Sequence, residues 1–145
     1  MTPELAGLYQ RLILEHNARP RNCGPLPSST HEASMSNPLC GDTVTLRLRL
    51  TEERIVEVAF EGDGCALARA SASLLTLALA GRTKEEATVI AAELFKLLTR
   101  GPEHEQADRA LLGELAALEG VRDVPARRRC ATLPWEALGL ALAGP

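Results

Sequence analysis

Three cysteines and one aspartate lie in turn-like segments that are far apart in the sequence. Cys40 and Asp42 flank a glycine, Cys65 follows a glycine, and Cys130 follows a run of three arginines. Thiolates and carboxylates that converge from distant segments commonly hold a metal ion or handle sulfur. Three thiolates and one carboxylate form a four-ligand set that suits Zn²⁺, and sulfur ligands suit an iron–sulfur cluster almost as well.

The remaining candidates for ligands are weaker. A lone cysteine is usually a small buried apolar residue, and the separations of 25 and 65 positions between the three cysteines match no compact zinc finger. Asp63 is a rival carboxylate, but a loop carboxylate just before a helix is usually a solvated cap. We expect Cys23 to be a spare surface thiol. We also expect the three histidines to lie on the surface, namely His16, His31 and His104.

Composition limits the class of protein. A chain of 145 residues predicts one domain spanning 1–145, and the net charge of −3 provides no general attraction for nucleic acid. The one concentrated basic run, Arg127–Arg129, is either a solvated face or a charge clamp for a partner. The absence of ~18 consecutive apolar residues predicts no membrane span, and the N-terminus lacks a signal-peptide layout. We therefore expect a cytoplasmic protein with reduced thiols.

Hydrophobic periodicity predicts an α+β fold, because alternating segments are followed by segments with helical spacing. The apolar residues of 43–50 alternate, as do Val56, Val58 and Phe60 in the next segment, which predicts an antiparallel hairpin with one buried face. A weaker strand is expected at 31–37. The predicted helices cover residues 2–17, 65–80, 83–98, 105–118 and 130–142.

Two of these predicted helices begin at candidate ligands. Helix starts at Cys65 and Cys130 would favour thiolate over thiol, because unpaired N–H groups and the helix dipole stabilise negative charge there. Pro134 would then fall in or near the first turn of the last helix, where proline is tolerated. Cys40 and Asp42 lie two residues apart, so an extended segment would direct both side chains to one side.

The chain resembles the IscU/SufU/NifU N-terminal family of iron–sulfur cluster assembly proteins. Three motifs carry the resemblance, and together they span nearly the whole chain: Asn37-Pro38-Leu39-Cys40-Gly41-Asp42, Gly64-Cys65-Ala66 with the Ala/Ser-rich segment after it, and Arg129-Cys130-Ala131-Thr132-Leu133-Pro134-Trp135. The resemblance implies an IscU-like fold, in which a small antiparallel three-stranded sheet packs against about five helices.

Three departures from IscU point to the SufU branch of this family. IscU has histidine directly before its third site cysteine, whereas this chain has Arg129, which stays protonated and cannot ligate a metal. The Leu-Pro-Pro-Val-Lys stretch of IscU is replaced here by 121–126, and the segment between Cys65 and Cys130 is longer. SufU-type proteins are similar zinc-containing acceptors of sulfur from a cysteine desulfurase that carries pyridoxal phosphate.

The resemblance implies that Cys40, Asp42, Cys65 and Cys130 hold Zn²⁺ and that Cys40 accepts the persulfide sulfur. Two alternatives stay open at this point. The same cysteines, Cys40, Cys65 and Cys130, could carry a transient [2Fe–2S] cluster that is passed to apoproteins. Alternatively, zinc could be a structural staple in a docking module that activates the desulfurase. No nucleic acid or membrane partner is expected, and an enzymatic activity would at most be that of a sulfurtransferase-type acceptor.

Overall fold

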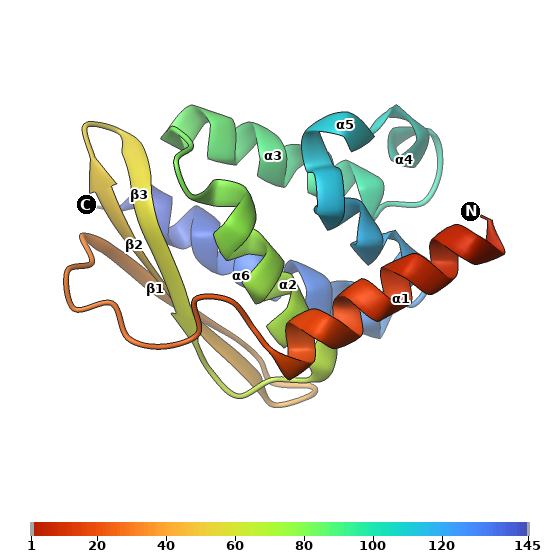
Figure 1. Cartoon of the computed structure of the whole chain (residues 1–145), viewed down its shortest axis with the longest axis horizontal. Helices are drawn as coiled ribbons and strands as arrows, with labels where there is room; N and C mark the ends of the chain where they lie inside the picture. Colours follow the sequence, from red (N-terminus) through yellow and green to blue (C-terminus); the bar gives the residue numbers. More distant parts are fainter. Residues whose placement is uncertain (1, 145) are drawn as a thin grey trace.

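The computed structural model describes residues 2–144. A three-stranded sheet lies at one end of the molecule, and two of the short helices lie at the other (Figure 1). The elements follow in this order: α1 (Pro3–Ala18), β1 (His31–Asn37), β2 (Asp42–Thr51), β3 (Arg54–Glu61), α2 (Ala66–Leu79), α3 (Lys84–Leu97), α4 (Pro102–Gln106), α5 (Arg109–Leu112), the 3₁₀ helix η1 (Gly113–Val121) and α6 (Pro125–Ala143).

The sheet has the order β1-β2-β3, and both neighbouring pairs are antiparallel. Leu46 and Leu48 of β2 are fully buried, since α6 packs over β1 and β2 while α2 packs against β3. On the opposite face, Arg47 pairs with Glu32 and Glu61 on the flanking strands. One face of the sheet is therefore dry and the other wet, as the alternation predicts. The α+β class and the IscU-like arrangement are confirmed.

The hairpin contains an irregularity that the sequence pattern did not predict. The register between β2 and β3 shifts beside Leu50, so Val56 is an extra residue on β3. This β-bulge reverses the alternation at the start of the strand. Ile55 is consequently buried, and Val56 is 40% exposed. The expectation that Val56 shares the buried face of Val58 and Phe60 was wrong.

The helical segment between Gly101 and Val121 also differs from the prediction. Instead of one helix over 105–118, the chain forms α4, α5 and η1 in succession. Asp108 begins a new helix by accepting the backbone N–H of Leu111, and Gly113 adopts a left-handed conformation with φ of 55°. These two local features interrupt a pattern that looks continuous in apolar periodicity.

Helix α6 begins five residues before the predicted start. Pro125 occupies its first turn, where the missing N–H costs nothing, and Pro134 lies in the helix interior. The prediction that Pro134 lies near the first turn was therefore wrong. Cys130 is in the second turn, not at a helix start, so the helix-dipole argument applies to Cys65 and not to Cys130.

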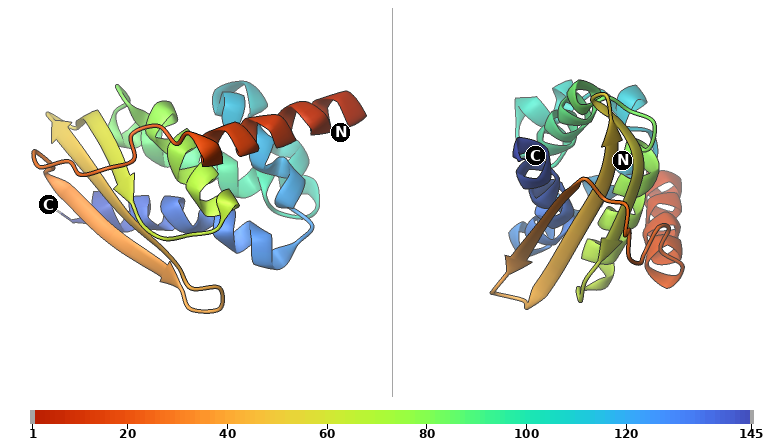
Figure 2. Two further views of the ribbon diagram at one scale, coloured as in Figure 1. Left: turned by 60° about the horizontal axis from the view of Figure 1, so that its bottom comes forward. Right: turned by 90° about the vertical axis from the view of Figure 1, so that its left-hand side faces the viewer.

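Two loops leave the same end of the sheet (Figure 2). The β1–β2 loop carries Cys40, and the β3–α2 loop carries Gly62. The backbone N–H of Thr43 donates to the carbonyl of Asp63 at 2.7 Å. A Cβ on Gly62 would lie 2.1 Å from the Thr43 carbonyl oxygen, so glycine is required for this approach. Within residues 2–144, no helix combines the length and apolarity needed to cross a membrane.

Candidate metal centre

The β1–β2 loop positions Cys40 and Asp42. Asn37 organises this loop, because its side chain accepts the Leu39 N–H and its carbonyl accepts the Gly41 N–H. Gly41 is left-handed with φ of 74°, so the segment is a turn and not the extended strand considered above. Cys40 is exposed, whereas Asp42 is the first residue of β2 and is only 4% exposed.

Cys65 is the N-cap of α2 and lies next to Asp42. Its backbone N–H donates to Asp42 Oδ1 at 2.9 Å, and its Sγ accepts the Ala68 N–H at 3.5 Å. Gly64 leaves room for this contact, because a Cβ there would lie 3.7 Å from Asp42 Cγ and 3.3 Å from Ala68 Cβ. The structure therefore brings Cys65 to the aspartate through its backbone, and its sulfur is directed to the helix N-terminus.

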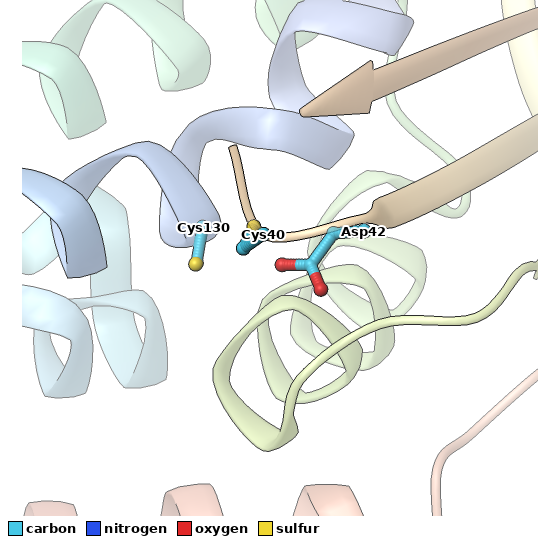
Figure 3. A group of neighbouring side chains, drawn as sticks. All are labelled: Cys40, Asp42 and Cys130. Atoms are coloured by element: carbon cyan, nitrogen blue, oxygen red, sulfur yellow. The ribbon is translucent and has the colours of Figure 1, made fainter. Parts of the chain in front are cut away.

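Cys130 completes a cluster with the β1–β2 loop. One ligand atom each from Cys40, Asp42 and Cys130 lies within 4.8 Å of the other two. Figure 3 shows the Asp42 carboxylate directed toward the two cysteines, which come from the loop and from α6. Bond lengths of 2.0–2.3 Å place the ligands of a tetrahedral zinc roughly 3.3–3.8 Å apart, so a small contraction would fit an ion.

The electrostatics of the cluster favour a bound cation. Burial alone would raise the pKa of Asp42, but the neighbouring thiols of Cys40, Cys65 and Cys130 and the hydrogen bond from the Cys65 N–H outweigh it and lower that pKa. Burial raises the pKa of Cys130 far above its usual value, and Cys65 and Asp42 raise it further. A buried carboxylate thus adjoins a thiol that cannot ionise without compensation.

Asp42 also has an unpaired oxygen. Its Oδ2 is buried without a hydrogen-bond partner, and among residues 2–144 no basic side chain lies within ion-pairing distance of its carboxylate. A buried unpaired carboxylate oxygen is costly, and a metal ion would satisfy it. The sulfur-rich donor set, the buried charge and this orphaned oxygen together fit a thiophilic divalent cation.

The other sequence candidates lie outside this cluster. Cys23 is exposed, as expected, and Asp63 is exposed and contributes a backbone carbonyl. The surface prediction was wrong for two histidines: His16 is 2% exposed and bonds Ser73, and His104 is 7% exposed and bonds the Leu97 carbonyl. Both are buried because they fix helices to one another, a role that no local sequence pattern shows.

A groove of about 1100 Å³ opens beside the cysteines. Its walls come from α1, the β1–β2 loop, the start of α2, η1 and the start of α6, and Cys40, Cys65 and Cys130 all line it. Leu39, directly before Cys40, is 96% exposed. The sequence did not predict that Leu39 is exposed, since an apolar residue in a turn can equally be buried.

The arginine run divides its side chains between two settings. Arg127 and Arg129 line the groove, whereas Arg128 does not. Arg129 donates to Glu136 Oε1 at 3.0 Å and is not part of the metal-ligand cluster. The basic run is therefore at least partly a wall of the groove beside the cysteines.

The fold and the site define a small α+β protein with a cysteine–aspartate cluster at one end of its sheet. Residues 8–131 match the family model of the NifU-like N terminal domain. The chain belongs to this family, as the motif resemblance predicted.

Named relatives and solved structures agree with this assignment. The chain is 40% identical to the zinc-dependent sulfurtransferase SufU of Bacillus subtilis over 90% of this chain and 86% of that protein. It is 36% identical to the iron–sulfur cluster assembly scaffold protein IscU of Streptococcus pyogenes over 96% and 85%. The crystal structure of FiSufU from Fervidobacterium islandicum, assigned to iron–sulfur cluster assembly for the SUF system, superimposes with a TM-score of 0.84 at 29% identity, covering 90% and 93% of the two chains. The N-terminal part of a NifU-like protein from Brucella abortus gives 0.81 at 27%, covering 93% and 92%.

Proposed function

We propose that this protein works in iron–sulfur cluster assembly by accepting persulfide sulfur on Cys40 from a cysteine desulfurase, at a zinc site. One observation carries the proposal. An exposed cysteine, Cys40, forms a cluster with a buried carboxylate and a buried thiol in a chain that is 40% identical to a zinc-dependent sulfurtransferase. Because Cys40 and Cys65 are exposed while Asp42 and Cys130 are buried, the site combines ion retention with reachable thiols.

Four residues would hold the zinc: Cys40, Asp42, Cys65 and Cys130. The first, second and fourth already form the cluster, and the backbone N–H of Cys65 donates to Asp42. Bound zinc would stabilise the thiolate forms at neutral pH and would not exchange electrons with the sulfur. The ligands come from separate segments, so metal binding would also stabilise the fold.

Exposure excludes Cys130 and leaves Cys40 and Cys65, of which Cys40 is favoured as the acceptor because its sulfur does not cap a helix. Cys130 is buried, and the sulfur of Cys65 accepts a helix N–H. In the transfer step, the Cys40 thiolate attacks the outer sulfur of the desulfurase persulfide. A new S–S bond forms on Cys40, the old S–S bond breaks, and the desulfurase cysteine leaves as a thiolate. No electrons are gained or lost overall, so no oxidant or reductant is needed.

The surface around Cys40 supports a protein as the sulfur donor. The groove is mostly apolar at its walls, Leu39 projects into solvent, and two arginines stand at the start of α6. Apolar anchors combined with arginine are typical of protein interfaces. In this proposal the pyridoxal phosphate belongs to the desulfurase, and apoproteins receive the sulfur further along the pathway.

The second candidate function is a scaffold that carries a [2Fe–2S] cluster as cargo. The 36% identity to a scaffold protein IscU over most of both chains favours it. Arg129 counts against it, because an arginine stands where IscU carries a ligand-type histidine. Anaerobic reconstitution with iron and sulfide, followed by visible absorption, tests this candidate: stable cluster bands on the wild-type protein would support the scaffold.

The direct test of sulfur transfer is a reaction with a purified pyridoxal-phosphate cysteine desulfurase and cysteine. Mass spectrometry should find a persulfide on Cys40 in the wild-type protein. The variant Cys40→Ser should lose both the persulfide and the stimulation of the desulfurase, whereas Cys23→Ser should match the wild type. Stimulation that survives in Cys40→Ser would instead indicate a zinc-stapled docking module, and it would refute Cys40 as the acceptor.

A further inference from the structure

Helices α2 and α6 carry two of the proposed ligands, Cys65 at the start of α2 and Cys130 within α6. The two helices pack against each other in the core, and Figure 1 shows α6 passing behind α2 beside the sheet. The buried part of α2 is built from small residues, among which Ala68, Ala70 and Ala72 are fully buried. Ser71 is also fully buried, as are two further polar residues of this helix, Ser73 and Thr76.

The hydroxyl of Ser71 connects the two helices. It donates to the carbonyl oxygen of Ala131 at 2.6 Å and accepts the indole N–H of Trp135 at 3.2 Å. Within residues 2–144, these are the only hydrogen bonds that join α2 to α6. Ala131 directly follows Cys130, so this link acts one residue away from a proposed metal ligand.

The turn of α6 that contains Cys130 needs such external support. Pro134 has no N–H, so the Cys130 carbonyl, four residues earlier, lacks its intrahelical donor. The proline ring also crowds that carbonyl and weakens this turn of the helix. The neighbouring Ala131 carbonyl is held by Ser71 from the other helix. The position of Cys130 is thus set by a bond to α2 where its own helix is weakest.

We propose that Ser71 is a positioning residue for the metal centre, which holds Cys130 against Cys40 and Asp42 by anchoring the Ala131 carbonyl. This inference rests on the proposed zinc site. Ser71 touches neither ion nor substrate, and it acts through the backbone of α6. Misplacement of one ligand by a fraction of an ångström is enough to weaken a tetrahedral site, since ligand orientation set by surrounding hydrogen bonds commonly contributes about 10–100-fold in metal affinity.

A purely structural role would give a different result, and Ser73 provides the matched control. Ser73 is equally buried on the same helix, but its hydroxyl bonds His16 and the backbone N–H of Arg21, on the side away from α6. Ser71→Ala and Ser73→Ala each remove one buried hydroxyl from α2. If serine matters only for stability, both variants lose stability and both keep the wild-type affinity for zinc.

The test measures Zn²⁺ affinity by chelator competition and the absorption spectrum of the Co²⁺-substituted protein, without a desulfurase. Ser71→Ala should bind Zn²⁺ about tenfold more weakly and show altered Co²⁺ ligand-field bands. Ser73→Ala should stay within about twofold of the wild type, with unchanged bands. Equal affinity and equal spectra in the two variants would overturn the proposal.

A second variant covers the possibility that Ser71→Ala folds poorly, because that change leaves the Trp135 indole N–H unpaired. The double variant Ser71→Ala/Trp135→Phe removes this orphaned donor, and Trp135→Phe alone keeps the bond from Ser71 to Ala131. The double variant should bind Zn²⁺ more weakly than Trp135→Phe, and equal affinity would overturn the inference. Failure of the wild-type protein to bind Zn²⁺ would overturn the proposed site itself.

Discussion

Asp42→Asn is the sharpest test of the metal centre. Asparagine keeps the size of the side chain and an oxygen that can accept the Cys65 N–H now bonded to Oδ1. It removes the negative charge and the unpaired Oδ2, which is the atom that a cation would satisfy. Asp42→Asn therefore tests metal ligation separately from the hydrogen bond to the Cys65 N–H, since it removes the charged ligand oxygen and keeps the hydrogen-bond acceptor.

The magnitude follows from the number of ligands. Structural zinc sites contribute about 10–16 kcal/mol, so one ligand of four corresponds to about 3–4 kcal/mol, or a loss of roughly 100–1000-fold in zinc affinity. A 100-fold change in affinity removes about 2.7 kcal/mol of zinc-dependent stability when the ion is in excess. For a domain of this size, the zinc-dependent rise in melting temperature should shrink by roughly 5–10 °C.

The assay compares thermal melting with added zinc and with a chelator, together with elemental analysis of protein purified without added metal. Asp63→Asn is the matched control, because Asp63 lies on the neighbouring loop but is exposed and outside the cluster. We expect Asp63→Asn to melt like the wild type in both conditions. An Asp42→Asn protein that retains the full zinc-dependent shift, or an equal loss in both variants, would refute the assignment of Asp42 as a ligand.

Two further predictions concern the parts of the fold that hold the site. Gly62→Ala should destabilise the protein by about 3 kcal/mol or more in denaturant unfolding, because the new Cβ would clash with the Thr43 carbonyl. Gly24 has a similar φ but open space around it, so Gly24→Ala should lose only the stability that backbone strain removes. Glu119→Gln should lower the free energy of unfolding by about 2 kcal/mol at pH 7, because it breaks the ion pair with Arg109. Burial alone would raise the pKa of Glu119, but the hydrogen bond from Arg109 outweighs it and holds that pKa below its usual value of about 4.5. The stability that the lowered pKa contributes is present above pH 4.5 and is lost as the pH falls below it. The difference in free energy of unfolding between wild type and variant should therefore become smaller in acid. A difference that stays constant down to pH 3 would contradict the ion pair.

Local patterns were sufficient for much of the architecture. Alternating apolar residues predicted the hairpin, and the helix predicted over 83–98 forms as α3, which begins at a capping box of Thr83 and Glu86. The failures have local physical causes. The β-bulge at Val56 changes the face without changing composition, and Gly113 divides an apparently continuous helix. Neither feature is visible in apolar periodicity, which registers only the spacing of apolar residues.

The metal centre was likewise predicted only in part from the sequence. The motifs singled out Cys40, Asp42, Cys65 and Cys130. The structure brings ligand atoms of Cys40, Asp42 and Cys130 together, whereas Cys65 reaches Asp42 through its backbone N–H. The argument that Cys130 gains thiolate character from a helix start was wrong, since α6 begins at Pro125 and Cys130 is buried. Burial of this thiol is set by packing of α2 and the β1–β2 loop against α6, which lie far from it in the sequence.

The sequence by itself determined the chemistry available to this protein: three thiols, one carboxylate, and glycines where the chain must turn tightly. It also determined the alternation and capping that produce a half-buried sheet and its covering helices, because these depend on neighbouring residues. Only the tertiary structure decided which thiols are reachable, which carboxylate oxygen lacks a partner, and that Ser71 bonds the carbonyl that follows Cys130. Exposure, pKa and ligand spacing depend on contacts between segments far apart in the chain, and such contacts exist only once the core has packed.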